Sequence, residues 1–448
     1  MKMLKKTMSI YSKKLLCCIA FAVFSITLFS GCWDRKETDQ LAMIGSIALD
    51  KLSEDKVLVS MEIVNAAALS RGLGVETGME GVVGWVIREE ASTVPNAILN
   101  AQRRVPLNIF IGQANTIILG QNFAREGEIA THLEYFSRRA EVRRSIFLAT
   151  CDSANNLLQR PFMEELPSLT LEGLAENSMV SGKSVTVTLN EFLMKLSEPG
   201  IEPITMHVAG RETKDVKIKQ QGETFQQERP VDSPRLPLES DVNVPGLLPP
   251  DHPALDPLRE GGTGEPIENL TVNLGIAAFK GDRLVGFLDG NHARGYLWVV
   301  GRMPRGGFLE IENPFDDSGI LGLKVVRVNS TMKPAIKGDE LSMSVDVTVD
   351  LELLALPIGI RSARKEEITK IEQAVNSFIE REIRATLRIV QREFQSDIYG
   401  FGQVLYRRNP YLWQELSEEW NEEIFPDLHI AVNVQSRARS SGTVMKRK

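Results

Sequence analysis

The residue best placed to do chemistry in this sequence is Cys32, within the stretch LFSGCWD. Two small residues, Ser30 and Gly31, stand directly before it. An apolar run of about 15 residues, from Leu15 to Phe29, precedes them, and the residues before that run include five lysines and no acid. A basic region, an apolar region and small residues follow one another in this order in export signals. The sequence therefore predicts a signal segment that ends just before Cys32.

Small residues followed by a cysteine form the pattern of a bacterial lipoprotein box, in which the cysteine is acylated. We predict a lipoprotein signal peptide over residues 1–31 and lipidation of Cys32, although Phe29 stands where such boxes more often have leucine. Two or three acyl chains, at about 0.8 kcal/mol for each buried methylene, give stable anchoring at a membrane surface. The alternative is an uncleaved short anchor with an incidental cysteine, but the apolar run is shorter than the roughly 20 residues of a spanning helix.

The other cysteines are not predicted to react. Cys17 and Cys18 would leave with the signal peptide, so Cys151 would be the one unmodified cysteine and no disulfide could form within a mature chain. Cys151, in SIFLATCD, is predicted to be a small buried hydrophobic residue at the end of a strand. A catalytic thiol needs a nearby base, and no neighbour in the sequence supplies one.

The histidines and carboxylates form no recognisable catalytic or metal-binding pattern. The five histidines lie far apart, at His132, His207, His252, His292 and His429. Of these, His292 in DGNHARG is beside an acid in a predicted turn, where an exposed hairpin residue is expected rather than a catalytic base. Carboxylates occur throughout, so no pair stands out as acid and base. We predict no catalytic residue, no metal site and no cofactor.

Two glycine-containing stretches resemble phosphate-binding loops but lack required positions. The GKS sequence at Gly182 to Ser184 would need a glycine five positions before Gly182, where Asn177 stands. Gly400 and Gly402, in YGFGQ, have no third glycine and no strand before them. Neither stretch is therefore predicted to bind a nucleotide.

Six aromatic residues could form a ligand cage, but aromatic residues spaced along amphipathic helices are more often packed in a core. They are Trp298, Tyr406, Tyr411, Trp413, Trp420 and Phe425. The C-terminus is basic and could touch anionic lipid headgroups, each basic residue contributing about 1 kcal/mol. Its basic residues are Arg437, Arg439, Lys446, Arg447 and Lys448. A plain solvated tail is the alternative.

The composition is that of a globular protein, with 43% hydrophobic and 25% charged residues. Residues 32–448 are too many for one core and indicate two or three domains. The formal net charge is -7, and removal of the five signal lysines leaves about -12. Because an acidic chain repels phosphate backbones, no nucleic-acid partner is predicted.

Local patterns predict an α+β fold. From about residue 40 to 160, strand-like runs alternate with helical segments, which indicates a mixed α/β unit that begins with a strand hairpin. Residues 341–353 alternate strictly between apolar and polar, so a long strand with one wet face is expected in an antiparallel or mixed sheet. A phase slip at Val325 and Val326 predicts a bulge in its partner strand. Residues 365–398 repeat apolar side chains at three- and four-residue steps, which predicts a long amphipathic helix packed near that sheet.

Three mixed α and β domains are predicted after the signal peptide. The predicted ranges are 32–184 for the N-terminal domain, 185–315 for the middle domain, 316–440 for the C-terminal domain and 441–448 for a basic tail. The middle domain contains a proline-rich insertion at about 214–268, where the prolines favour extended conformations over a regular ladder. After it, residues 269–300 are predicted to form three strands, with a turn at Asp289 to Asn291.

Three longer stretches lie near the beginning, middle and end of the chain: GCWDRKETDQLAMIGSIALD, FKGDRLVGFLDGNHARGYLWVVG and DIYGFGQVLYRRNPYLWQELSEEWNEEIFP. The first has a cysteine followed by Trp33, Asp34 and Arg35, then an apolar strand that ends in an acid. Together the three stretches resemble the C-subunit lipoproteins of bacterial spore nutrient germinant receptors, the Ger(x)C-type family. The resemblance covers nearly the whole mature chain, and the proline-rich insertion, longer than expected, departs from it.

The resemblance implies a non-enzymatic protein of three mixed α and β domains, anchored by Cys32 to the outer face of the inner spore membrane. It further implies assembly with two integral-membrane subunits into a receptor for small nutrients, such as amino acids or sugars, that triggers germination. No catalytic residues carry over from the family, and Cys32 alone transfers as a modified position.

A lipid-anchored solute-binding protein that captures a nutrient itself is the alternative function. It would require a cleft between two similar α/β lobes, whereas the predicted long helix and alternating strand match no second lobe. A hydrolase of the cell envelope would require converging acid, base or metal-binding residues, and the sequence shows no such set.

Overall fold

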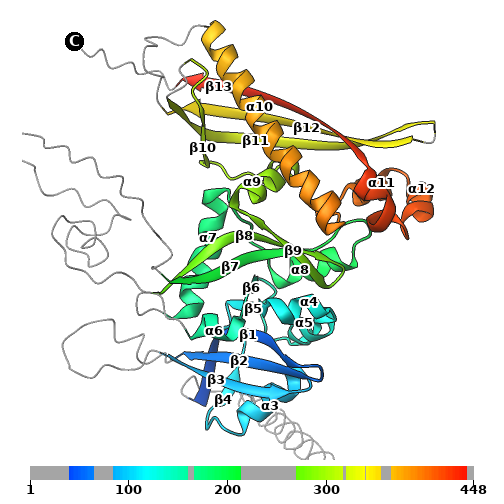
Figure 1. Ribbon diagram of the computed structural model, residues 1–448. Helices are drawn as coiled ribbons and strands as arrows, with labels where there is room; N and C mark the ends of the chain where they lie inside the picture. Colours follow the sequence, from blue (N-terminus) through cyan, green and yellow to red (C-terminus); the bar gives the residue numbers. More distant parts are fainter. Residues whose placement is uncertain are drawn as a thin grey trace, which may run out of the picture.

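The protein is represented by a computed structural model, which describes residues 40–64, 84–159, 166–212, 269–315, 319–338, 340–354 and 365–440. In Figure 1 a large sheet occupies the lower and middle parts of the molecule, and a smaller sheet lies at the top beneath a long helix. The predictions for Cys32, for the insertion at 214–268 and for the tail at 441–448 concern residues outside the described ranges.

The larger sheet has nine strands in the order β3-β2-β1-β5-β6-β7-β8-β9, with β4 paired to β1. The strands are β1 (Leu41–Ser53), β2 (Lys56–Val64), β3 (Gly84–Ala91), β4 (Asn108–Phe110), β5 (Thr116–Gly120), β6 (Phe147–Cys151), β7 (Ile204–Glu212), β8 (Asn269–Lys280) and β9 (Arg283–Asp289). Pairing is parallel from β1 through β5 and β6 to β7, and antiparallel at both ends of the sheet. The antiparallel β1–β2 pair confirms the predicted hairpin.

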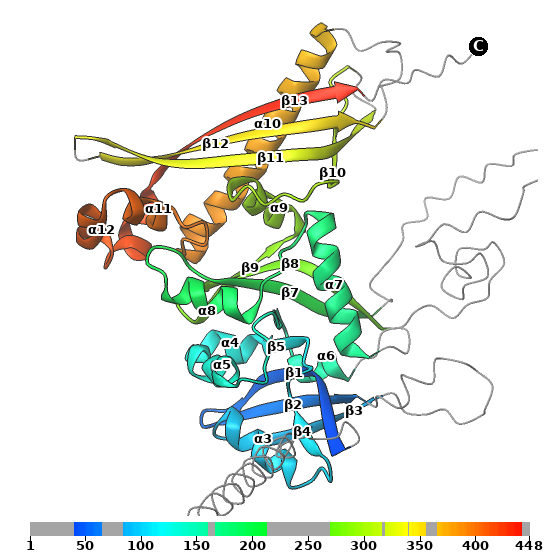
Figure 2. The same cartoon turned by 180° about the vertical axis from the view of Figure 1, so that it is seen from behind.

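Helices connect the parallel strands, because a parallel pair cannot be joined by a tight turn. They are α3 (Val94–Gln102), α4 (Gln121–Glu126), α5 (Ile129–Arg138), α6 (Ala154–Leu158), α7 (Pro167–Ser181) and α8 (Leu189–Ser197). Helix α3 begins with a capped turn, since the Thr93 side chain accepts a hydrogen bond from the Asn96 amide and Pro95 lies in the first turn. Figure 2 shows α7 and α8 from behind, beside β7 and β8.

The smaller sheet has the order β10-β11-β12-β13. Its strands are β10 (Phe308–Glu312), β11 (Ile320–Lys337), β12 (Glu340–Leu353) and β13 (His429–Ser440). The alternation predicted at 341–353 is confirmed in β12, where every second side chain from Met343 to Leu353 is buried. The predicted bulge is confirmed by a register shift between Val325 and Arg327 in β11. Because β13 runs parallel to β12, the sheet is mixed.

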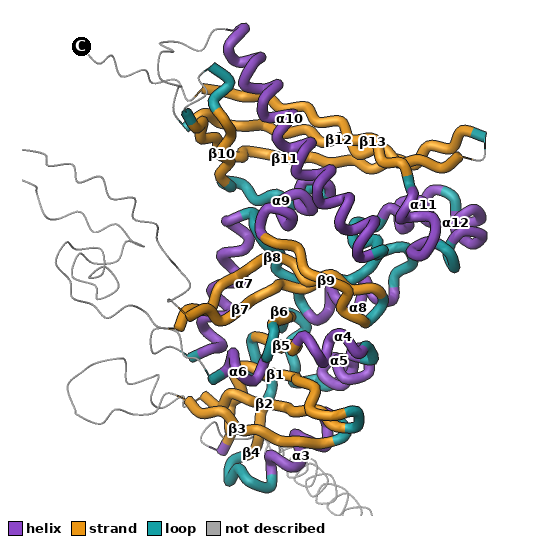
Figure 3. The backbone as a smooth tube through the Cα atoms, viewed as in Figure 1, coloured by secondary structure: helices purple, strands orange, loops and turns teal. Residues whose placement is uncertain are grey.

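The predicted long helix is also present. Helix α10 (Lys365–Ile389) continues into a π-helical turn, η4 (Val390–Phe394). It crosses one face of the smaller sheet diagonally, as Figure 3 shows. Ile371, Val375, Ile379 and Ile383 are buried along its inner side. Within the described ranges, no helix is long and apolar enough to cross a membrane.

One predicted element is wrong. The residues after the turn at Asp289 form helix α9 (Gly290–Val299) instead of a third strand. The Asp289 carboxylate caps this helix by accepting hydrogen bonds from the amides of Asn291 and His292, both at 2.9 Å. All residues from Ala293 to Val299 are buried. Helical periodicity was therefore absent from the sequence, because a helix buried on every side has no polar stripe.

The chain after α10 forms two short helices and then a compact corner. These elements are α11 (Phe401–Arg408), α12 (Pro410–Leu416), a second π-helical turn η5 (Trp420–Ile424) and α13 (Phe425–Asp427). They lie beside α8 in the middle of the molecule (Figure 2). This corner therefore connects the end of the long helix to the final strand, β13.

The predicted domain boundaries separate strands that the structure pairs. The boundary after residue 184 divides β6 from β7, which are neighbours in the larger sheet. The boundary after residue 315 divides β10 from β11, which pair along five residue positions from Phe308 to Glu312. One buried apolar cluster also includes residues of both sheets. Sequence patterns show where strands occur, but they do not show which distant strands become neighbours.

A buried ion pair joins α9 to α10. The Arg294 guanidinium donates to both Glu382 oxygens, with Nε 2.9 Å from each, and the Trp298 indole donates to Oε2 at 3.0 Å. The Arg294 and Glu382 side chains are 10% and 12% exposed. Gly295 permits the close contact, because a Cβ there would lie 2.6 Å from the Glu382 carbonyl oxygen. Helix α9 is thus held against α10 by an ion pair as well as by packing.

Glu382→Gln should lower the free energy of unfolding by about 3 kcal/mol, because it leaves the buried Arg294 charge without a carboxylate. The measurement is chemical denaturation of the purified protein. Glu380→Gln is the matched control on the same helix, since Glu380 pairs with Arg384 where both side chains are well exposed. That control should cost at most about 1 kcal/mol. Equal losses of unfolding free energy in the two variants would show that the buried Arg294–Glu382 pair contributes no more stability than an exposed pair.

A second buried carboxylate fixes the start of α7. Glu62 on β2 is 1% exposed, and its Oε2 accepts a hydrogen bond from the Ser168 amide at 3.0 Å. Burial raises the pKa of Glu62 from 4.5 to about 7, although the hydrogen bond from Ser168 opposes the shift. The folded protein therefore holds the Glu62 proton more tightly than the unfolded chain does.

This linkage predicts that stability contributed by protonated Glu62 is lost as the pH rises from about 4.5 through about 7. Glu62→Gln cannot ionise, so its unfolding free energy should rise relative to wild type by about 3 kcal/mol over that interval. Denaturation curves at several pH values measure the difference between the two proteins. Glu90→Gln, on the exposed face of β3, is the control. A wild-type-to-variant difference that stays constant with pH would contradict the linkage.

Candidate functional site

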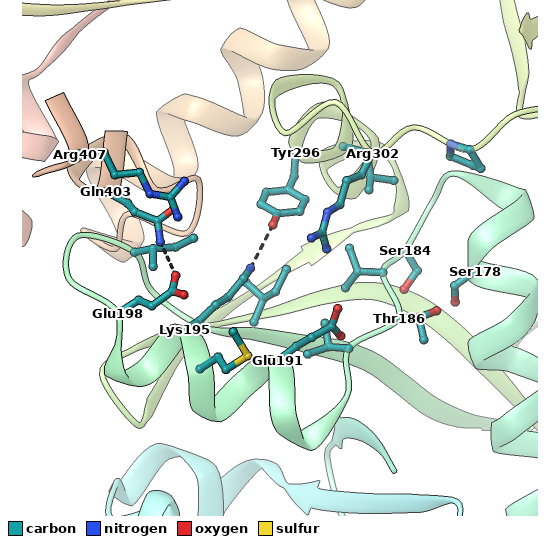
Figure 4. Close-up of a pocket in the computed structure, with 17 residues that line it drawn as sticks. Ser178, Ser184, Thr186, Glu191, Lys195, Glu198, Tyr296, Arg302, Gln403 and Arg407 are labelled. Atoms are coloured by element: carbon teal, nitrogen blue, oxygen red, sulfur yellow. Dashed lines mark hydrogen bonds between the residues drawn. The ribbon is translucent and has the colours of Figure 1, made fainter. Parts of the chain in front are cut away.

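A cleft of about 640 Å³ lies where the larger sheet meets the C-terminal half of the chain. Its walls come from α8, from the segment that precedes it, from α9 and from α11 (Figure 4). The volume is within the usual range of small-molecule sites, about 300–1,000 Å³. Because both halves of the chain contribute walls, the cleft depends on how they are joined.

Three cationic side chains face this cleft: Lys195 on α8, Arg302 after α9 and Arg407 on α11. The Lys195 ammonium donates to the hydroxyl of Tyr296 at 3.5 Å, a long contact for a hydrogen bond. Tyr296 is only 3% exposed, so its ring belongs to the core while its hydroxyl reaches the cleft. Figure 4 shows the Lys195, Tyr296 and Arg302 polar ends directed toward the same part of the cleft.

Two carboxylates also line the cleft, and both already have neutral hydrogen-bond donors. Glu191 accepts from the Thr188 amide at 2.9 Å and the Thr188 hydroxyl at 3.2 Å, which completes the capping box of α8. Glu198 accepts from the Gln403 side-chain amide. These contacts hold α8 and α11 in place, and within the described ranges no carboxylate pairs with the cations of the cleft.

The remaining lining is largely apolar and comes from both halves of the chain. It consists of Val185, Val187, Met194, Ile201, Ile204, Leu297 and Pro304. Ser184 and Thr186 also line the cleft, but their hydroxyls donate to the carbonyl oxygens of Gly275 and Ala175. The cleft therefore combines an apolar wall with a few polar groups, as small-molecule sites do.

A close backbone contact sets the distance between α8 and α11. The Gln403 amide donates to the Gly200 carbonyl at 2.7 Å. A Cβ on Gly200 would lie 2.3 Å from the Gly402 carbonyl carbon, and Gly200 has a φ of +74°. Gly402 in turn touches the indole of Trp413. Gly400 and Gly402, which resembled part of a dinucleotide loop, thus permit close packing.

Asp397 organises the turn that carries these glycines. It is completely buried, and its carboxylate accepts hydrogen bonds from the amides of Gly400, Phe401 and Gly402 at 2.8–3.2 Å. The Trp420 indole donates a fourth at 3.0 Å. Burial raises the pKa of Asp397 to about 6, although these four donors oppose the shift. Because all four hydrogen bonds come from the surrounding turn and from Trp420, Asp397 has a structural role.

Two further buried carboxylates in the described part of the chain are held by backbone amides in the same way. Asp50 accepts from the amides of Ala154 and Asn155, at 3.0 and 2.6 Å, at the start of α6. Glu202 accepts from the Gly281 amide at 2.6 Å in the β8–β9 turn. Burial raises the pKa of both groups. Buried carboxylates in this fold hold backbone turns, and sequence reasoning had no signal by which to identify them.

Two of the histidines pack against aromatic rings. His207 on β7 is 9% exposed and stacks on Phe287, with ring centroids 4.0 Å apart. Burial lowers the pKa of His207 to about 4, so the ring is neutral near pH 7. His132 on α5 lies 5.2 Å from the ring of Phe123, and burial lowers its pKa as well. Both are packing residues.

The expectation of an exposed hairpin position for His292 is wrong. His292 is a half-buried residue in the first turn of α9, and its Nδ1 lies 2.8 Å from Asp289 Oδ1. His429 begins β13 at a distant place in the fold, and His252 lies outside the described residues. Among the described residues, no three His, Cys, Asp or Glu side chains gather as metal ligands would.

The aromatic set and Cys151 lie mainly in the core, as expected. Trp298, Trp420 and Phe425 are at most 2% exposed and Trp413 is 8% exposed, whereas Tyr406 and Tyr411 are exposed. Cys151 ends β6 as predicted, and burial raises the pKa of its thiol well above the ordinary value.

Lys195, Tyr296 and Arg302 are the residues of the cleft that sequence reasoning missed. Lys195 and Tyr296 are 101 positions apart, and neither belongs to a short motif. The GKS stretch does end beside the cleft, but Gly182 ends α7 in a left-handed conformation instead of beginning a helix, as a phosphate loop requires.

Comparison with known proteins places the chain in a family. A family model described as "Spore germination protein N-terminal domain" matches residues 34–209. A second, described as "Spore germination B3/ GerAC like, C-terminal", matches residues 274–442. The cleft lies between these regions, because α8 belongs to the first and both α9 and α11 to the second.

Curated relatives match along almost their whole length. Spore germination protein KC of Bacillus subtilis (strain 168) is 21% identical over 429 residues, or 94% of each chain. The putative spore germination protein YfkR of the same organism is 23% identical and covers 90% of this chain and 91% of its own. The crystal structure of the GerBC protein aligns over 88% of this chain and 96% of that one, with a TM-score of 0.46 and 14% identity. With both family regions matched in order, the chain belongs to the Ger(x)C-type, or GerAC, family of spore germination proteins.

Proposed function

We propose that this protein is a lipid-anchored, non-enzymatic subunit of a spore germinant receptor complex, and that it takes part in sensing small nutrients that trigger germination. The observation that carries the proposal is the match of both family regions, in order, over residues 34–209 and 274–442. Four curated relatives from one organism are named as spore germination proteins, one of them as putative. The partners in the proposal are two integral-membrane receptor subunits.

Anchoring would come from Cys32 and would hold the protein on the outer face of the inner spore membrane. The support is in the sequence, where Ser30 and Gly31 precede Cys32 after a basic and then an apolar segment. More than one acyl chain would make this attachment stable. The remainder of the chain would then act from the membrane surface on partners within the membrane.

The non-enzymatic part of the proposal is supported by how reactive groups are used in the described ranges. The buried carboxylates of Asp50, Glu62, Glu202 and Asp397 each accept backbone amides. The Cys151 thiol is buried at the end of a strand. Side chains with these contacts contribute to folding and are not free to transfer protons to a substrate.

Direct capture of a nutrient remains a second candidate role, and the cleft of about 640 Å³ favours it. A lipid-anchored solute-binding protein would require two similar α/β lobes around the cleft. Here the walls belong to two unlike units, a nine-stranded sheet with short helices and a four-stranded sheet with one long helix. A capture role would therefore operate within the receptor subunit and not in a two-lobed binding protein.

Cys32→Ala should release the protein from the membrane fraction, because the substitution removes the thiol that accepts the lipid. Fractionation of the expressing cells, followed by immunoblotting, measures the distribution. Cys151→Ala is the matched control, since Cys151 is buried and should leave membrane attachment unchanged. A Cys32→Ala protein that is cleaved normally yet remains in the membrane fraction would refute the lipid anchor.

Deletion of the gene should abolish the response of spores to one class of nutrient, because a receptor subunit acts before ion and dipicolinate release. Germination triggered directly by pressure or by added dipicolinate should survive in the same spores. Loss of absorbance in a spore suspension measures both responses, and the wild-type gene supplied in trans should restore the first. An unchanged response to every nutrient tested would count against the receptor proposal.

A further inference from the structure

The cleft between the two family regions has the polar and apolar groups of a ligand site, and the described residues leave most donors of its cationic side chains unused. Within the described part of the chain, neither the Arg302 nor the Arg407 guanidinium has a hydrogen-bond or ion-pair partner. The Lys195 ammonium has three donors and makes one long contact, to Tyr296 at 3.5 Å. The cleft therefore holds cationic donors that the described residues do not satisfy.

The charge balance of the lining favours an anion. Three cations and two carboxylates face the cleft. Glu191 and Glu198 accept hydrogen bonds from Thr188 and Gln403, and in the described part of the chain neither forms an ion pair with one of the three cations. A carboxylate that enters would gain charge-assisted hydrogen bonds, which are shorter and stronger than neutral ones.

An apolar surface lies beside these donors. Met194 on α8 lines the cleft and is 50% exposed. Ile201 and Leu297 line the same cleft. Since methionine is unbranched and adapts to irregular shapes, this wall can receive an aliphatic or aromatic ligand body. Binding would remove the apolar surfaces of the wall and of the ligand from water, which the hydrophobic effect makes favourable.

We propose that the cleft binds a small organic carboxylate whose head group accepts hydrogen bonds from Lys195 and Tyr296, with Arg302 at the rim. The apolar body of the ligand then packs against Met194, Ile201 and Leu297. This inference goes beyond the proposed function and does not depend on it, because the site is defined by the contacts of this chain alone. The amino group of an amino acid is not required, and a neutral sugar lacks the head group that the donors select.

Three probes with the same phenyl body separate the head groups: 3-phenylpropanoate, L-phenylalanine and 3-phenylpropan-1-ol. Saturation-transfer NMR and titration calorimetry on the full chain, purified in detergent, measure their binding. We expect 3-phenylpropanoate to bind with a Kd of about 1 mM or lower, as suits a ligand of its size. The neutral alcohol should bind at least tenfold more weakly. L-Phenylalanine binding as well as 3-phenylpropanoate would support the shared carboxylate.

Variants then assign the head group to its donors. Lys195→Met keeps the aliphatic stem without the charge, and Tyr296→Phe removes only the hydroxyl; each should weaken 3-phenylpropanoate binding by roughly tenfold or more. Lys183→Met is the matched control, since Lys183 is exposed and does not line the cleft. Circular dichroism of each variant checks that it folds, and the comparison of probes on the wild-type chain needs no variant.

Several results would overturn the proposal. One is that 3-phenylpropanoate fails to bind the wild-type chain, and another is that the alcohol binds equally well. Binding of L-phenylalanine alone would show that the ammonium is essential and the carboxylate insufficient. A folded Lys195→Met protein with wild-type affinity would place any binding elsewhere. None of these results bears on the deletion phenotype, so a failure here and a failure of the receptor proposal are distinguishable.

Discussion

Burying a carboxylate costs several kcal/mol unless hydrogen bonds replace its hydration, and Asp397 meets this constraint with four donors. Three of the donors are consecutive backbone amides of the turn that begins α11, so the carboxylate fixes the course of the chain after the long helix. Its main chain is engaged as well, because the Asp397 carbonyl accepts from the Glu202 amide at 2.9 Å. One residue thus connects the smaller sheet and its helix to the larger sheet.

The cleft is a consequence of that connection. Once the turn is fixed, Gly402 lies against Gly200 so closely that a Cβ on Gly200 would meet the backbone of Gly402. Helices α8 and α11 are held together at this point, and residues of α9 form another wall of the cleft. The polar groups of the cleft are therefore positioned by backbone contacts that do not involve them. Changes at Lys195 or Tyr296 can alter binding while this frame remains.

Patterns that repeat within one helix or strand could be predicted from the sequence. Contacts between residues far apart in the sequence could not. The alternation of β12 and the apolar stripe of α10 are visible because each element has one wet side. Helix α9 was not predicted, since burial on all sides removes that contrast, and Asp289 was assigned to a turn when it is the helix cap. Lys195 on α8 and Tyr296 on α9 meet only in the folded chain, at the cleft, and no local signal marks either residue.

Because of the position of the cleft, a ligand bound there would affect how the two halves of the chain are arranged. Lys195 belongs to the larger sheet and its helices, whereas Tyr296 and Arg302 follow the C-terminal half of the chain. A ligand that contacts both sides binds best when the two halves are arranged as they are here, so binding would stabilise this arrangement over others. The first strands lie at one end of the molecule and the smaller sheet at the other (Figure 1). If Cys32 holds the first end at a membrane, occupancy of the cleft would act on the orientation of the second end.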